Sequence, residues 1–260
     1  MAERSTLRRL RDDLPREALA DLLVRRAEAD PDLAGRIEAE LAALPGRGPV
    51  DPAPIAAQAR TLLGRQIKRD YRDDYEAHGP ADALKQLVDK AVPFLEAGDG
   101  RNALKIPVAV AEPFIEQWLG YYVETDEDMY RLFTGLDRMM AEAALMSDLS
   151  ADERGSLRET IGGWEDDLND YAPEDGFFLV TAALRTAWDD PALRAVLAGK
   201  TGAALPESEE ENPEPIAVRL RVLAAAARTD EYLNLARAAG DEAALAGMCW
   251  CASAGSTRPC

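Results

Sequence analysis

Residues 14–44, LPREALADLLVRRAEADPDLAGRIEAELAAL, contain two runs of apolar residues at the three- and four-residue spacing of amphipathic helices. The members of the two runs are Leu19, Leu22, Leu23 and Ala27, followed by Leu33, Ile37, Leu41 and Leu44. Asp30 and Pro31 separate the runs, and these residue types favour the N-cap and the first turn of a new helix. The stretch therefore predicts a small helical hairpin.

The same periodicity continues through the rest of the chain. The expected helical runs cover residues 55–71, 84–95, 104–122, 125–140, 150–171, 180–188, 190–197, 216–227 and 232–239. Ala supplies 47 of the 260 residues, and Ala is the strongest helix former. Residues 177–181, FFLVT, are β-like, but helical spacing continues from Val180 to Trp188 and favours a helix. We expect an all-α fold, either an irregular α-solenoid or helical-repeat (TPR-like) array of antiparallel helix pairs, or an irregular helical bundle.

Prolines and capping patterns punctuate these runs. Pro93, Pro107 and Pro113 each lack a backbone donor, so we expect kinks or breaks at these positions. Residues 150–153, SADE, form a capping box, and residues 190–191, DP, are suited to begin a short helix.

Composition shifts divide the chain into helical segments separated by linkers. The expected order is an N-terminal helical hairpin (1–46), a linker (47–54), a main helical array (55–199), an acidic linker (200–215), the start of a C-terminal helical repeat (216–248) and a tail (249–260).

Charge and composition exclude several classes of protein. The net charge of −18 argues against a general nucleic-acid binder, which needs a basic surface. The single His, His78, excludes a His-rich metal site and an HExxH protease. The sequence contains no run of about 18 apolar residues, so we predict no transmembrane helix. The N-terminal residues lack the apolar core of a secretory signal and cysteines are few, so we expect a cytoplasmic protein.

Local patterns that imitate functional sites have structural interpretations. Gly199-Lys200-Thr201 resembles the end of a phosphate-binding loop, but Arg194 stands where that loop requires Gly. Gly199 is therefore predicted to end a helix. His78 follows a helical run, where its cationic form complements the helix dipole. The chain contains no nucleophile elbow and no Cys–His catalytic pattern, so we predict no catalytic residue and no cofactor.

Four aromatic residues, Trp118, Tyr121, Tyr122 and Tyr130, lie close together in the sequence. Core packing is one interpretation, and the alternative is that they line a groove between helices that binds a partner. We expect that partner to be a protein or peptide, with no direct binding of nucleic acid or membrane.

All three cysteines, Cys249, Cys251 and Cys260, lie within residues 249–260, CWCASAGSTRPC. Thiolates at this spacing are candidate zinc ligands. The alternative is a frameshifted tail, because the helical pattern ends at Met248. Back-translation of the tail with G+C-rich codons, read in a shifted frame, gives LVRLGRVDEAV, which is the start of an amphipathic helix. We favour the frameshift, which predicts no metal site.

Four stretches carry a resemblance to a known family. LPREALADLLVRRAEADPDL (14–33), DYRDDYEAHGPADALKQLVDKAVPFLEAGDG (70–100), LRTAWDDPALRAVLAG (184–199) and RTDEYLNLARAAGD (228–241) resemble the helical region that follows the zinc finger in bacterial SWIM zinc-finger proteins. No SWIM finger precedes residue 14, so none of the family's zinc ligands has a counterpart here. The resemblance implies a scaffold or interaction module without assigned catalytic residues.

These patterns favour a non-enzymatic helical-repeat scaffold that binds a protein or peptide partner. A first alternative is an accessory protein of a DNA-associated system, the remnant of a SWIM zinc-finger protein. A second alternative is an enzyme that uses buried carboxylates, which requires several Asp or Glu residues of raised pKa in a pocket.

Overall fold

The computed structural model describes residues 15–44, 48–67, 81–120, 127–168, 176–206 and 213–246. Every regular element in these ranges is a helix, so the predicted all-α class is confirmed. The helices are α2 (Arg16–Ala29), α3 (Pro31–Ala42), α4 (Ala53–Ile67), α5 (Ala81–Asp89), α6 (Val92–Glu96), α7 (Gly100–Gly120), α8 (Glu127–Met146), α9 (Ala151–Leu168), α10 (Phe178–Thr186), α11 (Pro191–Leu197), α13 (Glu214–Ala225) and α14 (Thr229–Ala238). No helix in this part of the chain is long and apolar enough to cross a membrane.

The predicted capping residues hold the helix starts. Asp30 accepts a hydrogen bond from the backbone N–H of Leu33 at 3.2 Å, and α3 begins with Pro31. Ser150 and Glu153 form the reciprocal pair of a capping box at the start of α9. These contacts satisfy backbone donors that have no partner within the helix, which fixes where each helix begins.

The prolines act differently according to their position. Pro93 lies in the first turn of α6, and the chain breaks between α5 and α6 just before it, as expected. Pro107 and Pro113 lie inside α7, which continues through both without a break. The β-like stretch at residues 177–181 begins α10, which confirms the helical interpretation.

Two helices begin earlier than the linker boundaries predict. α4 begins at Ala53 rather than Ile55, and α13 begins at Glu214 rather than Ile216. In each case a proline lies in the first helical turn, where its missing N–H would have no partner within the helix. The composition-based linkers at 47–54 and 200–215 are therefore too long at their C-terminal ends.

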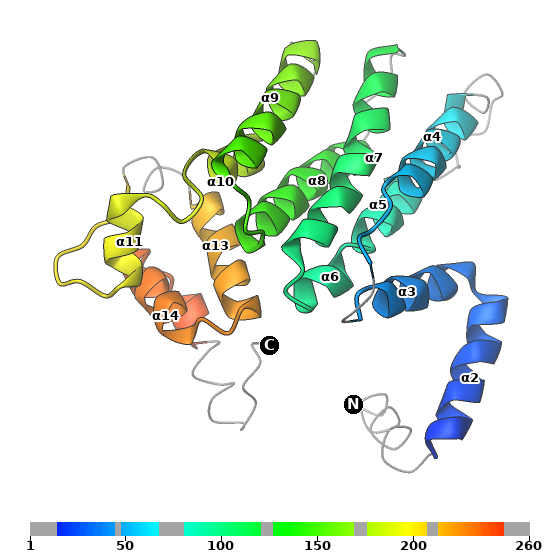
Figure 1. Ribbon diagram of the computed structural model, residues 1–260, viewed down its shortest axis with the longest axis horizontal. Coiled ribbons are helices and arrows are strands. Elements are labelled where there is room, and N and C mark those ends of the chain that lie inside the picture. The colour runs from blue at the N-terminus through cyan, green and yellow to red at the C-terminus, as the bar shows by residue number, and fades with distance from the viewer. Residues whose placement is uncertain are drawn as a thin grey trace.

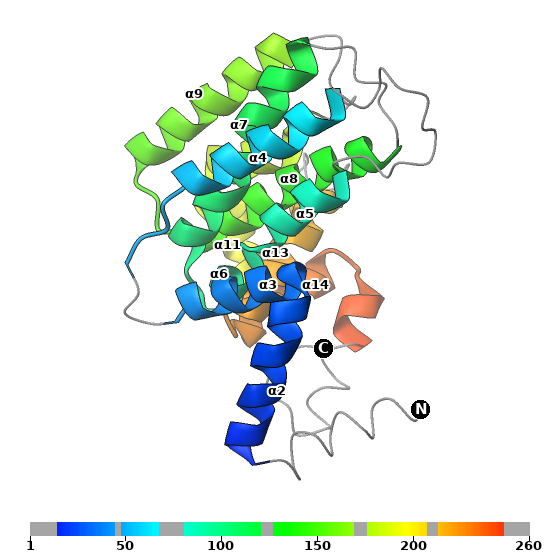
Figure 2. The same cartoon turned by 90° about the vertical axis from the view of Figure 1, so that its right-hand side faces the viewer.

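The helices that build the body of the protein lie in two layers (Figures 1 and 2). In one layer α7 packs against α4 and α9, and in the other α8 packs against α5 and α10. The start of α7 meets the end of α8, because Gly100 lies against the backbone of Ala143, Met146 and Ser147. α7 and α8 are therefore antiparallel and form the centre of the fold.

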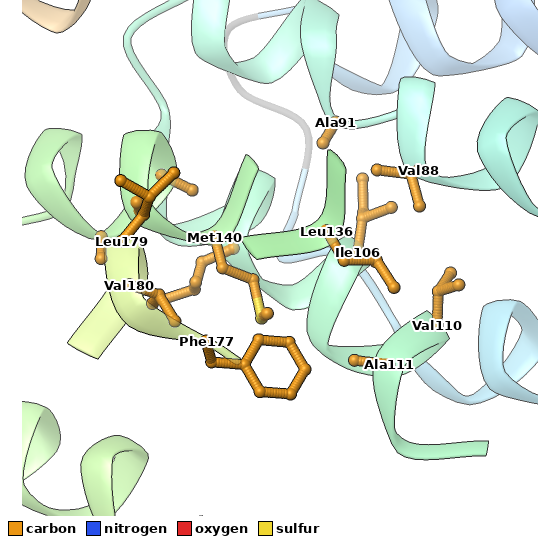
Figure 3. Close-up of a cluster of buried hydrophobic side chains, with 14 of the residues drawn as sticks. Val88, Ala91, Ile106, Val110, Ala111, Leu136, Met140, Phe177, Leu179 and Val180 are labelled. Carbon is orange, nitrogen blue, oxygen red and sulfur yellow. The ribbon is translucent and has the colours of Figure 1, made fainter. Parts of the chain in front are cut away.

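The main hydrophobic core fills the space between these layers (Figure 3). Phe177, just before α10, is fully buried. The centroid of its ring lies 4.6 Å from that of Phe133 and 5.6 Å from that of Trp164. Met140 of α8 points toward the same ring. One aromatic side chain thus joins α8, α9 and the start of α10.

A second core cluster joins α11, α13 and α14. α13 contributes to both cores: Val218 and Val222 pack into the main core, while Ile216, Leu220 and Leu223 pack into the second. A helix buried on two sides carries apolar residues around most of its circumference, as α13 does. α13 therefore fastens the C-terminal helices to the body.

Candidate functional site

Exposed large apolar side chains are concentrated on residues 16–44, which include α2 and α3 and are called the N-terminal arm below. Eight large apolar residues are exposed in the described part of the chain: Leu22, Leu23, Val24, Leu41, Leu44, Val92, Tyr130 and Phe178. The first five of them lie on the arm. Since clustered exposed apolar residues mark interaction sites more often than scattered ones do, the arm is the candidate docking surface.

The arm is attached to the body through α3. α3 packs against α6, with Ala39 buried and Gly35 next to the Lys90 side chain. α2 packs against α3, has no buried residue and projects away from the body (Figure 2). Two helices are thus present where the hairpin was predicted, but α2 and α3 meet at a corner and do not lie side by side (Figures 1 and 2), so α2 presents a largely uncovered surface.

A buried carboxylate, Asp137 of α8, lies at the start of α10. Only 4% of Asp137 is exposed. Its Oδ2 accepts a hydrogen bond from the backbone N–H of Leu179 at 3.0 Å, and its Oδ1 accepts one from Val180 at 2.8 Å. Glu165 of α9 accepts a third from the N–H of Phe177 at 3.1 Å. Carboxylates of two other helices therefore cap α10, in the position where the helix dipole favours negative charge.

Burial governs the protonation of Asp137. Desolvation raises the pKa of Asp137 to about 7. The two backbone N–H donors favour the ionised form and so lower the pKa, but their effect is smaller. The carboxylates of Glu165 and Glu214 raise it further. Because both oxygens of Asp137 already accept backbone hydrogen bonds, the geometry assigns this carboxyl to holding α10 on α8.

The titration of Asp137 predicts a pH-dependent stability. Between about pH 4 and about pH 7 the folded protein holds a proton that the unfolded chain releases, so the contribution of Asp137 to the free energy of unfolding falls as pH rises. The slope is at most about 1.4 kcal/mol per pH unit. Urea unfolding at pH 5 and pH 7, compared with Asp137→Asn, measures this contribution. A difference between the two proteins that does not change with pH would show that Asp137 stays ionised throughout.

A second carboxylate, which is only partly buried, lies where α8 meets α13. Burial raises the pKa of Glu142, while the nearby charges of Arg221 and Arg138 oppose the change. Arg221 Nη1 lies 3.1 Å from Glu142 Oε1. The ion pair links the central helix to the helix that joins the two cores, so its position indicates a structural role.

The segment that connects α10 to α11 joins the two cores. The indole N–H of Trp188 donates to the carbonyl of Leu145 at 2.9 Å, and the guanidinium of Arg228 lies 4.8 Å from the Trp188 ring centroid. Arg219 is buried and donates to the carbonyl of Ala187 at 3.3 Å. Ala187 has a positive φ of 46°, which costs energy for a residue with a side chain. These contacts hold the C-terminal helices against α8.

The residues singled out from the sequence are placed as follows. Gly199 has φ +65° and follows the last turn of α11, which confirms it as the end of a helix. Asp190 accepts hydrogen bonds from the N–H groups of Ala192 and Leu193, as a cap should. Tyr130 is exposed on the first turns of α8. The side chain of Trp118 lies outside the described part of the chain. The remaining predicted site residues lie outside it entirely, and these are Tyr121, Tyr122, His78, Cys249, Cys251 and Cys260.

The aromatic groove therefore stays an alternative to core packing, and the cysteine zinc site stays the alternative to the frameshifted tail that we favour. Within the described ranges no group of three His, Cys, Asp or Glu residues is arranged to hold a metal ion. Sequence periodicity did not single out Asp137, because its partners lie more than 40 residues away along the chain.

Comparisons with known proteins add no family. No protein-family model matches the chain, and no curated protein or solved structure shows a significant match. The resemblance to the helical region of SWIM zinc-finger proteins therefore stays a prediction.

Proposed function

We propose that the protein is a non-enzymatic helical scaffold that binds a protein or peptide partner through the N-terminal arm. The observation that carries the proposal is the concentration of exposed Leu and Val side chains on α2, on α3 and directly after α3. Covering such side chains in a complex removes apolar surface from water, which is the main favourable term in protein association.

The scaffold part of the proposal is an irregular α-solenoid of helix pairs, α4 with α5, α7 with α8 and α9 with α10. Its support is the packing of equivalent helices on one another: α7 packs against α4 and α9 on one side, and α8 packs against α5 and α10 on the other. A helical array of this kind gives a stable body on which a docking element is held at one end.

The polar groups of the body support a structural role for its buried carboxylates. Asp137 caps α10 and Glu142 pairs with Arg221, and both contacts join one helix to another. Each of these groups is engaged in maintaining the fold, whereas the arm presents side chains that nothing within the described chain covers fully.

A photo-crosslinking amino acid placed in the full chain tests the docking surface. We expect position Leu23 to give a discrete crosslinked product in an extract of the source cells, and Phe178, which is also apolar and exposed but lies on the body, to give none. A crosslinked product from position Tyr130, with none from Leu23, would show that the partner docks at the aromatic residues and not at the arm. Crosslinks from none of the three positions would contradict the proposal.

A further inference from the structure

The helices α11 and α14 form a pair at the end of the fold opposite α4 (Figure 1). They pack against each other, and the side-chain amide of Asn234 in α14 donates to the carbonyl of Leu197 in α11 at 2.9 Å. The core that they share with α13 is smaller than the main core. A small core that meets the rest of the fold mainly through one helix is suited to open by itself, before the whole chain unfolds.

The backbone is strained at two places where the chain passes between the main core and this pair. Ala187 connects α10 to α11 with φ 46° and ψ −116°, and Ala227 connects α13 to α14 with φ 53°. Among the described residues these are the two non-glycine residues with a positive φ, which costs energy because the Cβ lies too close to a carbonyl oxygen. The carbonyl of Ala187 accepts a hydrogen bond from Arg219 of α13 at 3.3 Å, which holds it in this conformation.

One contact joins the residues that follow the two strained positions. Trp188 follows Ala187 and Arg228 follows Ala227, and the guanidinium of Arg228 lies 4.8 Å from the centroid of the Trp188 ring. The indole N–H of Trp188 donates to the carbonyl of Leu145 in α8, and the Trp188 ring packs against both cores. Trp188 therefore holds the pair of helices on α8, while the strain at the two alanines opposes this arrangement.

The helix α13 is the part of the second core that stays on the main core. Val218 and Val222 of α13 pack into the main core, and Arg221 pairs with Glu142 of α8 at 3.1 Å. The pair formed by α11 and α14 covers the other side of α13, which carries the apolar residues Ile216, Leu220 and Leu223.

We propose that α11 and α14 open together from α13, by rotation of the backbone at Ala187 and Ala227, with Trp188 as the latch. Opening relieves the strain at both alanines, breaks the hydrogen bond of the Trp188 indole and uncovers the apolar side of α13. An ion pair between Arg154 of α9 and Asp189 also crosses this boundary, but it is partly exposed and contributes little to holding the pair closed. The fold thus contains a strap that is poised to open.

Native-state hydrogen exchange of the full chain, resolved to single helices, tests the proposal. We expect the amides of α11 and α14 to exchange through one common opening, faster than the amides of α8. Ala187→Gly and Ala227→Gly should each slow this opening by about threefold to tenfold, because glycine adopts a positive φ without strain. Trp188→Phe should speed it by about fivefold, because the hydrogen bond to the Leu145 carbonyl is lost.

Two control variants separate this opening from unfolding of the whole chain. Ala195→Gly makes the same replacement inside α11, where glycine weakens the helix, so it should speed exchange in α11 and α14 by about threefold. Gly135→Ala strengthens α8 without a clash, so it should slow exchange in α8 and leave α11 and α14 unchanged. Circular dichroism checks that each variant is folded.

Two results would overturn the inference. The first is exchange in α11 and α14 that is as slow as in α8, or that Gly135→Ala slows by the same factor as in α8, because the pair would then open only with the whole fold. The second is exchange in α11 and α14 that neither Ala187→Gly nor Ala227→Gly slows, because the strain would then play no part in the opening.

Discussion

Replacing Phe177 with alanine is expected to lower the free energy of unfolding by about 3–5 kcal/mol. Phe177 is fully buried, and its ring contacts those of Phe133 and Trp164. Truncation leaves a cavity where α8, α9 and the start of α10 meet, and this rigid packing cannot fully collapse into the space. Urea or thermal unfolding of the purified variant measures the loss.

The neighbouring phenylalanine provides a matched control. Phe178 is 37% exposed, so Phe178→Ala removes the same atoms from the next position of the chain with much less buried surface lost. We expect it to cost less than about 1.5 kcal/mol. Equal losses from the two variants would contradict the placement of Phe177 in the core and of Phe178 at the surface.

Replacing Gly100 with alanine is expected to cost about 3 kcal/mol, the largest effect of a single added methyl group in the described chain. A Cβ at Gly100 would lie 2.6 Å from the backbone nitrogen of Ser147 and 2.7 Å from the carbonyl oxygen of Ala143. Both atoms belong to the backbone at the end of α8, so relief requires that α7 and α8 move apart. Chemical denaturation compares the variant with the original protein.

A second glycine serves as the control for the first. Gly135 lies inside α8, is exposed, and has no atom within 4 Å of the position of an added Cβ. Gly135→Ala therefore adds helix propensity without a clash, and we expect a gain of about 0.5–1 kcal/mol. If Gly100→Ala were neutral or stabilising as well, this result would contradict the close approach of α7 and α8 at Gly100.

Local features of the fold were predictable because their signals lie within one turn of helix. Asp30, Ser150 and Asp190 cap the helices that follow them, as their residue types indicate. Gly199 ends α11 because glycine adopts a positive φ without strain. The helical class follows from the same local patterns and from the abundance of Ala.

Features that depend on distant contacts were not predictable. Asp137 caps a helix from more than 40 residues away, and no spacing rule connects it to Leu179 or Val180. The arm shows the same limit, because Leu22 and Leu23 follow the apolar spacing of a buried helix face but are 44% exposed. Periodicity identifies the apolar face of a helix, whereas tertiary packing decides whether anything in the chain covers it.

The body and the arm have different roles in this account, and their stabilities should differ accordingly. Two cores joined by α13 and by the contacts of Trp188 hold the body together. α2 has no buried residue and depends on α3 for its position. Helices with few buried contacts open at lower free energy than core helices, so α2 should gain order when a partner covers it.

The most direct test is hydrogen–deuterium exchange of the full chain, alone and in complex with the partner that Leu23 crosslinks. If the arm docks that partner, the amides of α2 will exchange more slowly in the complex than in the chain alone. The amides of α9, which is also largely exposed, will not change. Exchange in α2 that is equally fast with and without the partner, or exchange in α9 that slows to the same extent, would contradict docking through the N-terminal arm.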